Sequence, residues 1–205
     1  MNDSSPFVLE ARDARGVVTL TLNRPGAFNA LSEGMLGALE TAIAGIAADD
    51  TVRAVVIAGA GKAFCAGHDL KEMRAAPALD YYQRLFARCG EMMLSLQRLP
   101  VPVIARVHGI ATAAGCQLVA VCDLAVASSE ARFAVSGVNV GLFCATPSVT
   151  LSRNLGRKEA FEMLVTGEFI GAEEAREKGL VNRVAPPAEL DAALEALLAL
   201  SLIHI

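Results

Sequence analysis

The sequence predicts a single α/β domain with a well-buried core. Its 205 residues correspond to one domain at roughly 100–200 residues per domain. Segments with strand-like and helix-like patterns alternate along the chain. The composition is 54% hydrophobic and 20% charged, which argues against disorder. With 18 Lys and Arg against 22 Asp and Glu, the chain has no basic excess, so we expect no nucleic-acid partner.

The first sixty residues predict a β-α-β unit. Residues 17–22 are rich in β-branched side chains and end in the turn sequence Asn23-Arg24-Pro25-Gly26, which is typical of a strand and a loop. From Leu31 to Ile46, apolar residues recur at helical spacing. Residues 53–58 form a short apolar run that predicts the second strand. Such a unit implies parallel pairing with a right-handed crossover.

The alternation continues to the end of the chain. We expect helices over 82–99, from about Gly109 through Leu118, over 157–166, over 172–178 and after Pro186-Pro187, and strands over 101–107, 124–127 and 180–184. Thr146-Pro147 has the pattern of an N-cap followed by Pro at the first helical position. Gly167 and Gly179 are placed to end two of the helices.

Cysteine usage and the N-terminal sequence indicate a reducing location without membrane insertion. The five cysteines contain no C-x-x-C pair, and an odd number fits reduced, buried thiols. We find no basic segment followed by an apolar stretch at the N-terminus and no apolar run of about 18 residues. We therefore expect a cytoplasmic protein that does not contact a membrane.

Several common site motifs are excluded. Residues 56–63 lack the first glycine and the final Ser or Thr of a phosphate loop, and Phe64 replaces the third glycine of a dinucleotide fingerprint. His68, His108 and His204 are scattered without metal-ligand spacing, so no metal is expected. No G-x-S-x-G elbow is present. Cys116 follows a glycine at an expected helix start, and a buried structural thiol is its favoured interpretation.

Two segments are unusual for a generic α/β domain: KAFCAGHDLKEM at residues 62–73 and VHGIATAAGCQLVAVCD at residues 107–123. They resemble the two signature segments of the crotonase superfamily, also called the enoyl-CoA hydratase/isomerase family. Residues 113–117 and 137–144 further resemble one branch of it. The resemblance implies the crotonase (ClpP-like) spiral fold of repeated β-β-α units. It also implies an acyl-CoA or enoyl-CoA thioester as substrate, with coenzyme A as part of that substrate and no permanently bound cofactor.

The resemblance also assigns the groups that would stabilise an enolate. The family polarises the thioester carbonyl with two backbone N–H groups, an oxyanion hole. By residue matching these groups are the N–H of His68, after Ala66-Gly67, and the N–H of Ala114 at a helix N-terminus, where the helix dipole favours an anion. His68 is also the most plausible proton carrier, because its ordinary pKa lies near neutrality. A role for its N–H alone is the favoured alternative.

Coenzyme A carries phosphates, which an acidic protein must meet with local cations. Lys62, Lys71, Arg24 and Arg74 are candidates, although a solvated surface role is favoured for the two arginines. By residue matching, the loop over 26–28 lies beside the pantetheine, and the backbone carbonyl of Ala66 meets the adenine. The residues expected at the coenzyme A site are Gly26, Ala27, Phe28, Lys62, Ala66, Asp69, Leu70 and Lys71.

Two positions depart from the hydratase pattern. Hydratases of this family use two glutamates to hold and activate water, and the matching positions here are Gln117 and Gly137. Neither residue exchanges a proton near neutral pH, so ordinary hydration is expected to lose about 10² to 10⁴-fold per missing group. The leading hypothesis is an enzyme of the lyase or isomerase class in fatty-acid metabolism. The alternative is an acyl-CoA-binding protein with weak turnover or none.

The end of the chain also departs from the family. Family members continue with further C-terminal helices, whereas this sequence ends in LALSLIHI. We therefore expect one domain over 1–205 that lacks those helices, with its core over about 10–190 and a non-native tail over 200–205. The resemblance implies a homotrimer or hexamer for a full-length chain.

Overall fold

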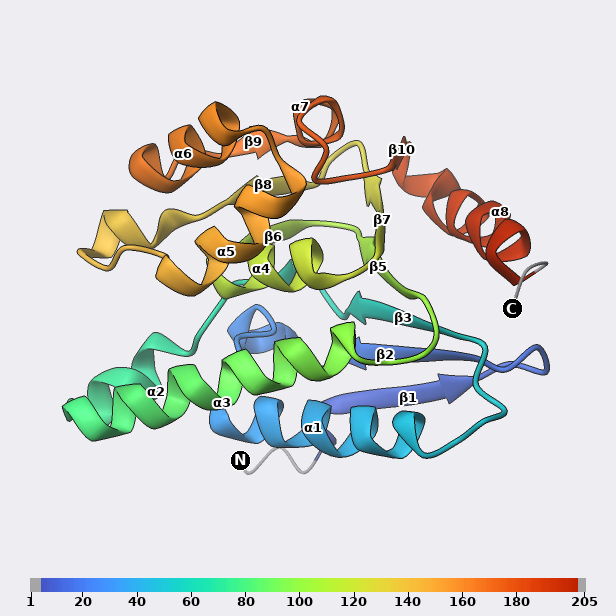
Figure 1. The fold of residues 1–205 in the computed structure, drawn as a ribbon, viewed down its shortest axis with the longest axis horizontal. Helices are drawn as coiled ribbons and strands as arrows, with labels where there is room; N and C mark the ends of the chain where they lie inside the picture. Colours follow the sequence, from blue (N-terminus) through green and yellow to red (C-terminus); the bar gives the residue numbers. More distant parts are fainter. Residues whose placement is uncertain (1–4, 203–205) are drawn as a thin grey trace.

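Two β-sheets organise the protein in the computed structural model, which describes residues 5–202 (Figure 1). The larger sheet has the strand order β1-β2-β3-β5-β7-β10. Only β1 is antiparallel to its neighbour; the other pairs are parallel. Its strands are β1 (Val8–Arg12), β2 (Val17–Leu22), β3 (Ala54–Gly59), β5 (Val103–Val107), β7 (Leu124–Ser128) and β10 (Arg183–Ala185).

The smaller sheet is built from very short strands in the order β4-β6-β8-β9. Its strands are β4 (Ala63–Cys65), β6 (Ile110–Thr112), β8 (Arg132–Ala134) and β9 (Ile170–Gly171). Three times, a strand of the large sheet is followed by one of the small sheet and then by helical structure. The chain therefore winds through repeated β-β-α units, as the family resemblance implied.

The helices cover both faces of the larger sheet (Figure 1). Ser32 caps α1 by accepting a hydrogen bond from Met35 N at 3.2 Å, which explains why the helix begins after the turn. The helical elements are η1 (Pro25–Ala27), α1 (Glu33–Ala47), α2 (Leu70–Ala75), α3 (Leu79–Gln97), α4 (Ala114–Val121), η2 (Ser136–Val140), α5 (Ala145–Asn154), α6 (Arg157–Thr166), α7 (Ala172–Glu177), η3 (Pro187–Glu189) and α8 (Leu190–Leu202).

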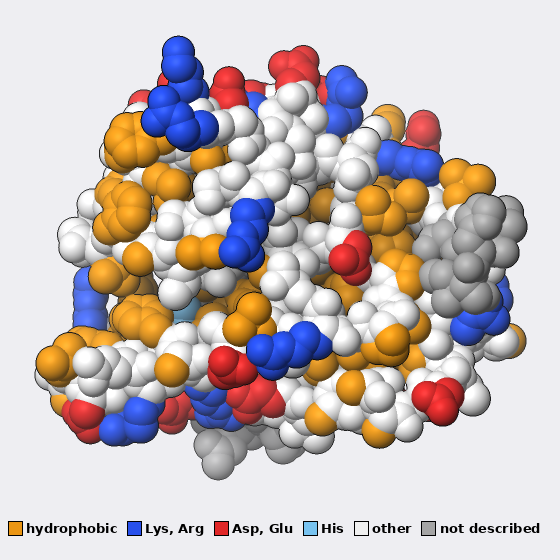
Figure 2. Space-filling view, viewed as in Figure 1, with side chains coloured by type: hydrophobic (Ala, Val, Ile, Leu, Met, Phe, Trp, Pro, Cys, Tyr) orange, Lys and Arg blue, Asp and Glu red, His pale blue; other side chains and the backbone are white. Residues whose placement is uncertain are grey.

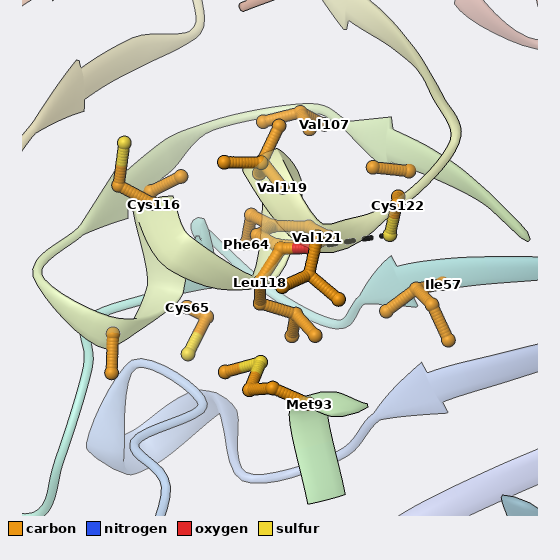
Figure 3. Packing of buried hydrophobic residues seen from close by; sticks show 14 of the residues in the cluster. Ile57, Phe64, Cys65, Met93, Val107, Cys116, Leu118, Val119, Val121 and Cys122 are labelled. Carbon is orange, nitrogen blue, oxygen red and sulfur yellow. Dashed lines mark hydrogen bonds between the residues drawn. The ribbon is translucent and has the colours of Figure 1, made fainter. Parts of the chain in front are cut away.

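The main core lies between the larger sheet and helices α1, α3 and α4. Alternate residues of β3 face it: Val55 and Ile57 belong to this core, whereas Ala54 and Val56 face the other way. Helix α4 is buried along its whole length. Its side chains pack against those of β3, β4 and α3 (Figure 3). This burial fixes the position of the helix N-terminus.

A second core lies on the opposite face of the larger sheet, under α8. There Leu190, Leu194, Leu197 and Leu198 pack against side chains from β2, β3, β5 and β7. Buried core residues thus extend past residue 190, the boundary that we expected. Leu202 is part of α8, whereas residues 203–205, including His204, lie outside the described residues. The expected tail over 200–205 stays a prediction.

Several element boundaries differ from the sequence-based expectation. The helix expected from about Gly109 begins only at Ala114, because residues Ile110–Thr112 form the strand β6. Helix α5 begins at Ala145 with Cys144 as N-cap, so Thr146 is not the cap and Pro147 lies inside the first turn. Helix α3 begins at Leu79 instead of Tyr82. Strand β10 begins only at Arg183, because the N–H groups of Leu180 and Val181 bond to Ala175 O in the turn after α7.

Candidate functional site

Two loops that are distant in sequence meet at the start of α4. The first follows β4 and contains Gly67 with φ +86°, a conformation that glycine adopts without strain. A Cβ built on Gly67 would lie 3.2 Å from Ala114 N and 3.0 Å from Ala113 Cβ. Because Gly67 has no side chain, the backbone next to His68 can lie close to the backbone next to Ala114. The signature segments are therefore neighbours in space.

The N-terminus of α4 is held in an unusual conformation. Ala113 has φ 51° and ψ −120°, a strained geometry for a residue with a side chain. Ala113 N donates to Ala134 O at 3.0 Å, and this hydrogen bond holds the residue in place. A Cβ on Gly115 would lie only 2.1 Å from Cys65 O, so the two backbones approach closely at this glycine. Helix α4 is thus pressed against β4.

The two backbone N–H groups at this junction are free to bind a ligand. Within residues 5–202, neither His68 N nor Ala114 N donates a hydrogen bond to another residue. Both residues line one cavity of about 280 Å³. The cavity is lined by Ala66, His68, Leu70, Met73, Phe86, Ala113, Ala114, Ser136, Gly137, Val140, Leu142, Phe143, Cys144, Ala145, Thr146 and Pro147. The two residues that carry these amides therefore share one cavity.

The His68 side chain is buried in an apolar environment. Its ring packs edge-on against Phe86, with ring centroids 5.1 Å apart and an interplanar angle of 75°. Its Nε2 has no hydrogen-bond partner among the described residues. Desolvation by burial lowers the pKa of the imidazole to about 4, so the ring is neutral at pH 7 and a weak base.

Gln117 and Gly137, the positions matched to the hydratase glutamates, are both buried. Gln117 is 4% exposed and its Oε1 has no partner among the described residues. It lies on α4 one turn after Ala113, but it is not one of the cavity-lining residues. Gly137 does line the cavity. A Cβ at Gly137 would lie 2.3 Å from Leu142 O and 2.6 Å from Cys144 Sγ, so a side chain has no room there.

The residues predicted for coenzyme A binding gather beside the first loop. Ala66 N donates to Phe28 O at 3.0 Å, which joins the 26–28 segment to the residues after β4. Phe28 is 56% exposed, and Lys62 and Lys71 are exposed as well. Leu70 lines the cavity. Gly26 is exposed, whereas Ala27 and Ala66 are half-buried.

Asp69 has a structural role. Its carboxylate caps α2 by accepting from Lys71 N at 3.0 Å and from Glu72 N at 3.3 Å. It also pairs with Arg24 at 3.1 Å, and the Arg24 guanidinium lies 5.5 Å from the centroid of the Phe7 ring. Arg24 is therefore engaged within the protein, not a solvated surface charge. These contacts account for Asp69 without any ligand.

Sequence reasoning missed several residues of this site. Asn29 is fully buried and holds the loop, since its Nδ2 donates to Ala60 O and Ala63 O, both at 2.8 Å. Met73, Phe86, Leu142 and Phe143 form cavity walls. An Asn close after a Pro-Gly turn was a usable signal for Asn29, because Asn tolerates positive φ more readily than most residues and Asn29 has φ 55°. The wall residues come from separate elements and carry no local motif.

Other candidate chemistry finds no support in the structure. Cys116 is fully buried, and desolvation by burial raises the pKa of its thiol to about 12, so it is an inert core residue. Over residues 5–202, no group of three or more His, Cys, Asp or Glu side chains is arranged to hold a metal ion. None of the helices described is both long and apolar enough to cross a membrane.

Comparison with known proteins identifies a matching family and similar proteins. A model of the enoyl-CoA hydratase/isomerase family matches residues 12–201. The chain is 46% identical over 191 residues to the Mus musculus protein "Enoyl-CoA hydratase domain-containing protein 3, mitochondrial", and 47% identical over 188 residues to the Homo sapiens protein of that name. The matches cover 93% and 92% of this chain, but only 64% and 62% of those relatives. The chain thus spans less than two thirds of their length.

Solved structures show the same similarity. The crystal structure of an enoyl-CoA hydratase from Mycobacterium smegmatis is 68% identical, with a TM-score of 0.96, and the match covers 97% of this chain and 77% of that one. Human enoyl-CoA hydratase domain-containing protein 3 gives 43% identity and a TM-score of 0.91, covering 97% and 78%. These similarities confirm the resemblance, including the branch indicated by residues 113–117 and 137–144, and they confirm the spiral fold.

The predicted cytoplasmic location is wrong by the same comparison. The relatives from Mus musculus, Rattus norvegicus and Homo sapiens are named as mitochondrial proteins. The inference from cysteine usage was too broad, because the lack of a disulfide pattern argues only against oxidising compartments.

Proposed function

Because the chain belongs to the enoyl-CoA hydratase/isomerase family, we propose that it binds an acyl- or enoyl-CoA thioester and stabilises its enolate with the N–H groups of His68 and Ala114. The observation that carries the proposal is the pair of adjacent loops whose two amides have no partner within residues 5–202 and whose residues line one cavity. The proposed substrate includes coenzyme A, and no further cofactor is required.

The chemistry follows from where negative charge develops. Removing a proton from the α-carbon of a thioester, or adding a nucleophile to the β-carbon of an enoyl thioester, places negative charge on the carbonyl oxygen. Preorganised donors at that oxygen lower the barrier. Ala114 N is the first amide of α4, where the helix dipole adds a positive partial charge. The apolar surroundings strengthen both interactions, because fewer water molecules compete with them.

Within this proposal His68 acts through its backbone. Its imidazole is neutral at pH 7, with a pKa lowered to about 4 by burial, and is therefore poorly matched to proton transfer near neutrality. The ring packs against Phe86, which helps to hold the loop. We assign the side chain a packing role and the N–H the role of donor.

Hydration of the enoyl double bond is expected to be weak. Gln117 and Gly137 replace the two glutamates that the family pattern places there, and neither residue supplies an acid or base. The second candidate function, acyl-CoA binding without turnover, is favoured by this same observation. Turnover of crotonyl-CoA separates the two, and a rate within tenfold of ordinary hydratases would contradict the argument from Gln117 and Gly137.

The donor assignment is tested by Ala114→Pro, which removes one N–H at a helix position that tolerates proline. Binding of acetoacetyl-CoA and the ultraviolet absorbance of its enolate report enolate stabilisation without turnover. Loss of one donor is expected to weaken it by about 2.7 to 4 kcal/mol, judged from a comparable oxyanion hole. His68→Ala keeps its N–H and should have a mild effect.

The matched control is Ala172→Pro. Ala172 is likewise a buried alanine at the first position of a helix, α7, and it does not line the cavity. It should leave the enolate absorbance unchanged, and thermal unfolding checks that both variants fold. An Ala114→Pro protein that folds and stabilises the enolate like the wild type would refute the assignment, and so would a larger loss in His68→Ala.

A further inference from the structure

The walls of the cavity contain no charged side chain. Its polar side chains are His68, Ser136 and Thr146. His68 is uncharged at neutral pH because burial lowers its pKa to about 4. The Ser136 hydroxyl is already engaged, since its Oγ lies 2.6 Å from Thr112 Oγ1 in a hydrogen bond. A carboxylate on a bound acyl group would lose its hydration here without gaining a cationic partner, which is strongly unfavourable.

Apolar side chains continue from the interior to the mouth of the cavity. Met73 from α2, Ala114 from α4 and Cys144 before α5 are each at most 9% exposed. At the mouth, the exposed apolar residues are Leu70 on one side and Val140, Leu142 and Phe143 on the other, each between 43% and 57% exposed. Hydrophobic side chains also gather over α2 and around η2 in the space-filling view (Figure 2). Exposed apolar clusters of this kind mark binding surfaces.

The size of the cavity sets a scale for the group that it holds. Its volume is about 280 Å³, whereas a dry protein cavity of about 150 Å³ accommodates benzene, with six carbons. By that ratio the cavity holds about ten or eleven non-hydrogen atoms. A thioester oxygen and sulfur together with an acyl group of about eight carbons fill that space.

We propose that this cavity selects uncharged acyl groups of medium length, about eight carbons, over short acyl groups and over acyl groups that end in a carboxylate. Leu142, which lines the cavity and is 44% exposed, is the position at which an added cation is expected to relieve the rejection of charge. The inference rests on the proposed function, because it assumes that the thioester oxygen lies at His68 N and Ala114 N.

The test is isothermal titration calorimetry with saturated acyl-CoA esters, which cannot be hydrated. Each buried methylene should tighten binding about fourfold, so octanoyl-CoA should bind on the order of 100-fold more tightly than butyryl-CoA. Valeryl-CoA and glutaryl-CoA have acyl chains of equal length and differ in the terminal carboxylate. Glutaryl-CoA should bind at least about tenfold more weakly, since its carboxylate has no partner.

A charge placed at the mouth should change this preference. In Leu142→Lys, the ratio of glutaryl-CoA to valeryl-CoA affinity should rise about tenfold or more, because the carboxylate gains a cation. Leu94→Lys is the matched control: Leu94 is 39% exposed, close to the 44% of Leu142, and does not line the cavity. That variant should keep the wild-type ratio.

The outcomes separate this inference from the proposed function. Equal affinities for butyryl-CoA and octanoyl-CoA, or for valeryl-CoA and glutaryl-CoA, would overturn the selectivity while leaving thioester binding intact. An equal change of the ratio in both lysine variants would overturn the role of Leu142. Failure of every ester to bind would overturn the proposed function as well.

Discussion

At the scale of single residues, Gly137 is a position where the surrounding structure leaves no room for a side chain. Its neighbours fill the space that a Cβ would need: Leu142 O would lie 2.3 Å away and Cys144 Sγ 2.6 Å away. Leu142 N also donates to Gly137 O at 2.9 Å, which closes the turn after η2. The backbone at this position therefore leaves no room for a side chain, and a glutamate introduced here would require Leu142 and Cys144 to move.

We expect Gly137→Ala to lower the free energy of unfolding by about 1 to 3 kcal/mol through overpacking, and Gly137→Glu to lower it further without gaining hydration of crotonyl-CoA. Gly171→Ala is the control, because a Cβ there meets no atom within 4 Å and should change stability by no more than about 0.5 kcal/mol. Urea denaturation and the crotonyl-CoA assay measure both effects. A stable Gly137→Glu protein with rapid hydration would contradict this view.

The family resemblance directed attention to His68 and Ala114 as candidate donors, and the structure brings the two segments that carry them together. Small residues around His68 and Ala114 are needed for the close approach of two loops, and that requirement is readable in each segment. The cavity walls are different, because Met73, Phe86 and Leu142 belong to α2, α3 and the loop before α5. Only the tertiary arrangement brings them together, and an apolar residue on an amphipathic helix has the same pattern in a core.

At the scale of elements, the longer strands and helices were predictable because burial imposes a period on them. Strand β3 is a continuous apolar run, and helix α1 has buried apolar residues at helical spacing. Both lie within a few residues of the expected positions. The residue pattern did not predict the strands of the smaller sheet, since they have only two or three residues. A strand of that length shows no measurable alternation, and its pairing is fixed by the path of the larger sheet.

Helix α8 is expected to contribute strongly to stability, because it covers the second face of the larger sheet. Leu198→Ala should lower the free energy of unfolding by about 2 to 5 kcal/mol, since Leu198 is 1% exposed and belongs to the core under α8. Leu200→Ala, on the same helix and 56% exposed, should change it by no more than about 0.5 kcal/mol. Equal, small effects in chemical denaturation would show that α8 does not stabilise the sheet.

At the scale of the whole molecule, burial of His68 links the candidate site to global stability. In the folded protein, desolvation by burial keeps the imidazole uncharged down to a pKa of about 4, whereas in the unfolded chain it takes up a proton below its ordinary value of about 6.5. The unfolded state therefore binds more protons between these two values. Stability must decrease as pH falls through that window.

We expect protonation of His68 in the unfolded chain to lower the free energy of unfolding by about 3 kcal/mol between pH 6.5 and pH 4. In His68→Gln, which is uncharged at every pH, the loss of stability over this range should be smaller by about that amount. The measurement is urea denaturation at several pH values across the window.

The comparison variant is His108→Gln. Burial also lowers the pKa of His108, although a hydrogen bond between Nε2 and Gly61 O opposes the shift. Its substitution should therefore remove a smaller part of the pH dependence. Carboxylates that titrate in the same range affect the wild type and both variants alike, so they cancel in the differences. If wild type and His68→Gln lost stability in parallel, the imidazole would be accessible to protons in the folded state, and its assignment to packing would have to be replaced by one in proton transfer.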